Sequence, residues 1–125
     1  MTNALLWLYL VNAILLINHE IDSAYWKEWE LFKIKGGLSG FLIIHFFLLF
    51  AILFGLIEVY KESLTGFIFS FLLCGGGIFA FSIHMFFLKK GRDEFKTTIS
   101  IAILISNLLV SFVQLGFTII AIISL

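Results

Sequence analysis

The chain has 125 residues, of which 62% are hydrophobic and 13% are charged; soluble domains are only ~45–50% apolar, so the composition excludes a soluble fold. Eight Lys and Arg residues balance eight Asp and Glu residues, and this lack of a basic surplus argues against nucleic acid as a partner. The single cysteine, Cys74, excludes an internal disulfide framework. We therefore expect a membrane protein with up to four spans joined by short loops.

The first apolar run, residues 3–17, is shorter than the ~20 residues that a membrane-spanning helix needs. We therefore expect the helix to continue to about Phe32, with its membrane span covering residues 3–25 and its charged side chains at the edge of the hydrocarbon layer. Trp26 and Trp29 lie among the charged residues that follow, as aromatic side chains do at a membrane–water interface.

Three further apolar runs each have the length of a membrane span. They cover about residues 38–59, 64–88 and 97–124. A glycine-rich break precedes the first of these runs, and a tight turn and a charged loop separate the others. The whole chain, residues 1–125, is thus predicted to be one transmembrane domain, an all-α integral membrane four-helix bundle. His45 lies in its second span and His84 in its third.

The basic residues are divided unequally between the two ends of the predicted bundle. Seven of the eight Lys and Arg residues lie in the loops after the first and third spans, and only Lys61 lies in the loop after the second. Because short loops rich in Lys and Arg stay in the cytoplasm, we predict that both basic loops are cytoplasmic and that both termini are outside.

One histidine lies in each of the first three spans, at a similar predicted depth. With a rise of ~1.5 Å per residue, His19, His45 and His84 lie about 9, 10 and 6 Å from the cytoplasmic side. Glu20 and Asp22 lie within one helical turn of His19. Imidazole and carboxylate groups are ligands of Zn and of other divalent transition metals, so these side chains predict a metal site.

Either carboxylate suits the role of metal ligand, and the other would act as a general base or orient a ligand imidazole. We assign Glu20 as the catalytic residue. The predicted metal ligands are His19, Asp22, His45 and His84. Ionisable groups inside a membrane are costly and mark functional sites. We therefore favour a metal-dependent hydrolase that acts on a lipid or a lipid-linked substrate, with Zn or another divalent transition metal as cofactor.

The same polar side chains have a second interpretation, in which they only hydrogen-bond across helices at about 1 kcal/mol or less each. The protein would then be a non-enzymatic accessory subunit whose polar seam specifies helix packing. A proton pathway is disfavoured because the other half of the bundle offers Asn107 and Gln114 but no ionisable group to complete a path. Five polar residues of the fourth span fall on one helical stripe, which we predict to face inward: Ser100, Asn107, Ser111, Gln114 and Thr118.

Small residues precede His84 at four-residue spacing, at Gly76 and Ala80. Close helix packing is the simpler explanation of such a row. The alternative is that the groove gives a lipid tail or another slender ligand access to His84. The expected partners are therefore the lipid bilayer and a lipid-like ligand.

The chain resembles an uncharacterised family of small bacterial four-span membrane proteins, which is catalogued as a domain of unknown function. The resemblance lies in a His-Glu-x-Asp motif that ends the first span, a following Lys-Glu-Trp motif, and single residues further along. These are His19-Glu20-Ile21-Asp22, Lys27-Glu28-Trp29, His45, His84, Glu94-Phe95 and Ser100. The resemblance implies a multi-pass protein of the bacterial cytoplasmic membrane and brings no reaction with it.

Overall fold

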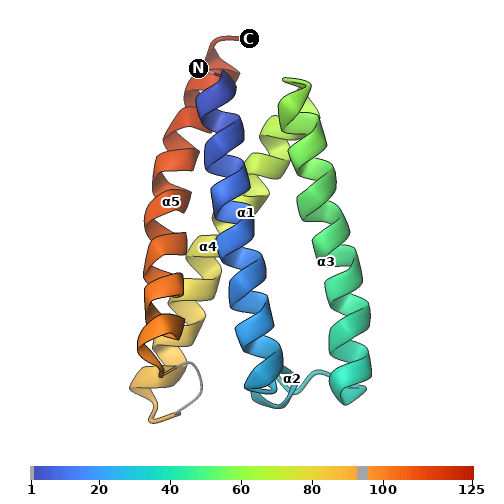
Figure 1. Cartoon of the computed structure of the whole chain (residues 1–125), viewed down its shortest axis with the longest axis vertical. Coiled ribbons are helices and arrows are strands. Elements are labelled where there is room, and N and C mark those ends of the chain that lie inside the picture. The colour runs from blue at the N-terminus through green and yellow to red at the C-terminus, as the bar shows by residue number, and fades with distance from the viewer. Residues whose placement is uncertain (1, 93–95) are drawn as a thin grey trace.

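Long helices occupy all four apolar runs in the computed structural model, which describes residues 2–92 and 96–125. Five helices and no strand are found in these residues. They are α1 (Thr2–Tyr25), α2 (Glu28–Leu31), α3 (Gly37–Tyr60), α4 (Leu64–Lys89) and α5 (Thr98–Ile123). The four long helices run the length of the molecule, with both termini at one end and the short α2 at the other (Figure 1). The predicted all-α four-helix bundle is confirmed.

The four long helices suit a membrane in length and in surface. Each has a stretch of 23 to 26 residues that is long and apolar enough to cross a bilayer. Their outward faces carry many exposed large apolar side chains. An apolar surface of this extent is not found on monomeric proteins in water. The chain is therefore a multi-pass integral membrane protein. Which end of the bundle faces the cytoplasm stays a prediction.

The inner face of α1 organises the bundle. Its buried residues recur every three or four positions, as one stripe of a 3.6-residue helix does. They are Leu5, Tyr9, Asn12, Ala13, Leu16, His19 and Ser23. The Tyr9 hydroxyl donates a hydrogen bond of 2.7 Å to the carbonyl of Ile52 on α3. This stripe is why His19 points into the bundle rather than toward lipid.

A polar network joins α1, α4 and α5 in the middle of the bundle. The Asn107 amide donates to the side-chain oxygen of Asn12 at 2.6 Å, and the Asn12 amide donates to Gln114 at 2.8 Å. The Gln114 amide donates in turn to the Ser70 hydroxyl at 2.8 Å, which lies 2.7 Å from that of Thr118. All five side chains are fully buried. The predicted inward polar face of the fourth span is confirmed.

The connection between α3 and α4 is tight because Gly66 lies directly against the backbone of Glu58. The two helices are therefore held together at this end. Toward the α2 end they separate (Figure 1).

Candidate functional site

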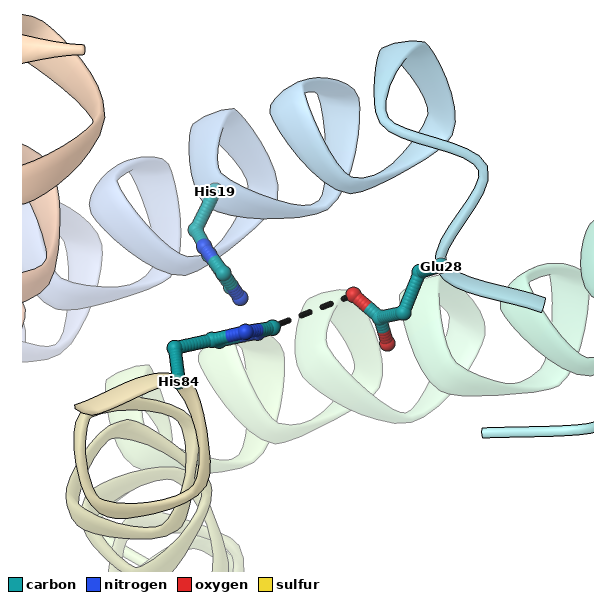
Figure 2. Close-up of side chains that lie close together, drawn as sticks. All are labelled: His19, Glu28 and His84. Atoms are coloured by element: carbon teal, nitrogen blue, oxygen red, sulfur yellow. Dashed lines mark ion pairs between the residues drawn. The ribbon is translucent and has the colours of Figure 1, made fainter. Parts of the chain in front are cut away.

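Three buried side chains from three separate segments meet near the α2 end of the bundle: His19 of α1, Glu28 of α2 and His84 of α4 (Figure 2). One ligand atom of each lies within 4.8 Å of the other two. The side chains are 1%, 8% and 2% exposed, respectively. The two imidazole rings meet edge to face with centroids 4.6 Å apart, and His84 Nε2 lies 3.7 Å from Glu28 Oε2.

Regular helix geometry positions both histidines. His19 belongs to the buried stripe of α1, and one turn later the Ser23 hydroxyl donates to the His19 carbonyl at 3.0 Å. His84 ends the buried stripe of α4, in which Gly77 and Ala80 precede it. The Phe32 ring covers the His84 ring at a centroid distance of 6.1 Å. The prediction that His19 and His84 lie at the same level agrees with this geometry.

A break in the helix positions Glu28. α1 ends at Tyr25, and Lys27 takes a left-handed backbone conformation with φ of 53° before α2 begins. The expectation of one continuous helix to about Phe32 is therefore wrong. In such a helix, Glu28 would lie about 180° around the axis from His19, whereas the turn at Lys27 folds it back under the bundle.

The environment of Glu28 favours its neutral form. Burial, together with the nearby Glu20 carboxylate, raises the pKa of the Glu28 carboxyl to about 7 against the opposing effects of Ser23 and His45. A cation beside this carboxyl would therefore replace a proton near neutral pH. The sequence reasoning did not select Glu28, and its one signal was the Lys-Glu-Trp motif of the family resemblance.

His45 and Glu20 form a second pair beside the cluster. His45 Nδ1 donates to the carbonyl of Phe41 at 2.7 Å, and its Nε2 is hydrogen-bonded to the Glu20 carboxylate. Because the carbonyl can only accept, Nδ1 carries a proton. Glu20 Oε1 also lies 4.0 Å from His19 Nε2.

The remaining predicted ligand, Asp22, is engaged elsewhere. Its Oδ1 accepts a hydrogen bond of 3.0 Å from the indole nitrogen of Trp26. The structure therefore brings His19 and His84 together with Glu28, places His45 with Glu20, and directs Asp22 toward Trp26. Metal ligation by Asp22 and His45 stays a prediction. Glu94 and Phe95 of the resemblance lie outside the described residues.

The side chains of the cluster and of the His45–Glu20 pair line one cavity of about 290 Å³. They are His19, Glu20, Glu28, His45 and His84. Two imidazoles and one carboxylate could hold a metal ion, and this donor set suits zinc and several other divalent transition metals. Donor atoms around tetrahedral zinc lie ~3.3 Å apart, given bonds of ~2.0–2.1 Å. Movements of the three side chains on the order of 1 Å would bring their ligand atoms to that separation.

Comparison with known proteins identifies the family of the chain. The model of a family described as "Family of unknown function (DUF6713)" covers residues 5–121, nearly the whole chain. No curated protein and no solved structure matches the chain.

Proposed function

The chain belongs to the DUF6713 family, and from its site we propose that it binds a divalent transition metal through His19, Glu28 and His84. The observation that carries this proposal is the convergence of three buried ligand atoms within 4.8 Å. His84 of α4 lies at least 56 positions along the chain from the other two residues, so its meeting with them is not a consequence of local sequence. Burying ionisable groups in a membrane protein is costly without a role that uses them.

The cavity around this cluster supports metal-dependent hydrolysis. Three protein ligands leave a coordination position for water, and a bound metal would make that water a stronger acid. Glu20 lies beside His19 and is held by His45, and these contacts support its proposed role as the general base that accepts the water proton. The substrate we propose is a lipid or a lipid-linked molecule, since the cavity lies within the apolar bundle.

Two finer features belong to the same proposal. His45 or Asp22 would supply a further ligand if the side chains rearranged on metal binding. The site would lie near the cytoplasmic leaflet of a bacterial inner membrane, because the basic loops lie at this end of the bundle.

Metal analysis tests the binding step. Purified protein is stripped with a chelator, reloaded with zinc in slight excess, separated from free metal and analysed for bound zinc. We expect stoichiometric zinc in the wild type and a large loss in His84→Asn. A His84→Asn variant that folds normally and binds as much zinc as the wild type would overturn the proposal. A parallel His45→Asn variant shows whether His45 is a further ligand.

Product analysis tests the hydrolytic step. Zinc-loaded protein is reconstituted in phospholipid vesicles, and released fatty acids and headgroups are followed by mass spectrometry. We expect release by the wild type, and none by a Glu20→Gln variant that keeps its zinc. Glu62→Gln at the opposite end of the bundle is the matched control. Equal release from the wild type and Glu20→Gln would remove Glu20 from the mechanism.

The second candidate function, an accessory subunit without catalysis, has its own supporting observation. The network around Asn12 satisfies several buried polar side chains with one another, as expected of a seam that specifies packing. If the histidines served the same end, replacing His19 and His84 with Asn would lower thermal stability without changing metal content.

A further inference from the structure

A second cavity continues the site cavity along the bundle. It measures about 200 Å³ and is lined by apolar side chains together with Tyr9. The two cavities share three lining residues, Leu16 of α1, Leu48 of α3 and Gly76 of α4. They therefore form one slot between these helices. We name it the α1–α3–α4 slot. Its site end is ionisable and its other end is apolar.

The length of the slot matches one lipid chain. On α4 its lining extends from His84 at the site to Phe69, which at ~1.5 Å per residue is about 22 Å. One leaflet contributes about half of a hydrocarbon core of ~30 Å. The slot is thus long enough for a single acyl chain in extended form.

The slot opens sideways toward the membrane. Ile44 of α3 and Phe79 of α4 line the site cavity, yet they are 50% and 64% exposed. The two helices separate toward the α2 end (Figure 1). Lipid is the medium on this face, so an acyl chain can enter from the bilayer without crossing water.

We propose that the α1–α3–α4 slot binds one acyl chain of a membrane phospholipid, with the polar end of that lipid beside His19, Glu28 and His84. The ligand chemistry follows from the two ends of the slot, because only an amphiphile satisfies both. This inference rests on the proposed function and narrows its lipid substrate to a phospholipid that is held through one acyl chain. Chain binding itself needs no metal, so it can be tested separately.

Gly76 gives a sharp test because it lies where the two cavities join. A Cβ at this position would lie 3.5 Å from Leu16 Cδ2, which is ordinary contact. A small side chain is therefore accommodated, whereas a leucine would fill the junction. Gly75, one residue earlier, is exposed and would have nothing within 4 Å of its Cβ. Gly76→Leu and Gly75→Leu thus make the same chemical change inside and outside the slot.

The experiment is photolabelling of chelator-stripped protein in phosphatidylcholine vesicles. A small fraction of the phosphatidylcholine carries a diazirine in the middle of one chain, and labelled peptides are mapped by mass spectrometry. In the wild type and Gly75→Leu we expect label on the slot residues Leu48, Ile52 and Leu73. In Gly76→Leu this label is lost, while label on outward residues of α3 is unchanged.

Several results would contradict the proposal. Absence of slot label in the wild type, or equal slot label in Gly76→Leu, overturns it. A parallel sample uses palmitic acid with the same diazirine, and slot label from this acid alone would identify a free fatty acid rather than a phospholipid. If Gly76→Leu does not elute as folded protein, Leu48→Phe narrows the same junction from α3. Normal zinc binding without slot label would refute the lipid slot alone, and slot label without zinc binding would refute only the metal site.

Discussion

Replacing Glu28 with Gln removes the carboxylate of the proposed metal cluster while keeping the size of the side chain. Structural zinc sites with four ligands bind with about 10–16 kcal/mol, or roughly 2.5–4 kcal/mol per ligand. At 1.4 kcal/mol per tenfold, loss of one ligand weakens binding about 60- to 700-fold. Glu28 is only 8% exposed, so bulk water has little room to take its place. We therefore expect the zinc affinity of Glu28→Gln to fall by that factor.

The affinity is measured by competition with a chromophoric chelator in detergent. Glu30→Gln is the matched control, because it makes the same change on the same short helix at an exposed position. Its affinity should equal that of the wild type. A Glu28→Gln variant that loses less than about tenfold, or 1.4 kcal/mol, would show that Glu28 does not ligate the metal.

Three further outcomes are expected. Burial raises the pKa of Glu28 from 4.5 to about 7, so the metal-free protein should lose stability as the pH rises from about 4.5 to 7. Thermal unfolding measured at a series of pH values should show this loss in the wild type and not in Glu28→Gln. An equal loss in both proteins would exclude this carboxyl as its cause. Asn12→Ala removes three hydrogen bonds to side chains of α5, at about 0.6–1.7 kcal/mol each. Unfolding in mixed detergent should therefore show a loss of about 2–5 kcal/mol with unchanged zinc affinity, and unchanged stability would contradict the network. In Gly66→Ala the added Cβ would overlap the Glu58 backbone, which should lower the stability of the protein by about 1–3 kcal/mol. The melting temperature of Gly66→Ala should therefore be lower than that of Gly75→Ala, whose added Cβ meets open space. Equal melting temperatures would contradict the close contact of Gly66 with Glu58.

The fold could be predicted from the sequence because hydropathy alone determines which segments span a bilayer. The contact between His19 and His84 could also be predicted in part. The helical rise gives the depth of each histidine in the membrane, and the 3.6-residue stripe shows which helix face points inward. Both quantities are local properties of one helix. They are therefore contained in the order of residues along it.

Other features of the site depend on geometry that local patterns do not carry. Glu28 reaches the cluster through the left-handed backbone at Lys27, a conformation that residues other than glycine seldom adopt. The pairing of His45 with Glu20 depends on how α3 is rotated about its own axis against α1. Since α3 is apolar around most of its circumference, its sequence gives little indication of that rotation.

The order in which the chain is made gives the Asn12 network a further consequence. The α5 partners of Asn12 follow it by 95 to 102 positions, so α1 enters the membrane long before they are synthesised. During that interval its amide has none of its final partners, and the histidine face of α1 likewise waits for α4. The early bundle therefore lacks both the Asn12 network and the histidine cluster. The insertion of α4 and α5 completes them. Truncation before α5 should leave a chain that inserts but remains exposed to membrane quality control.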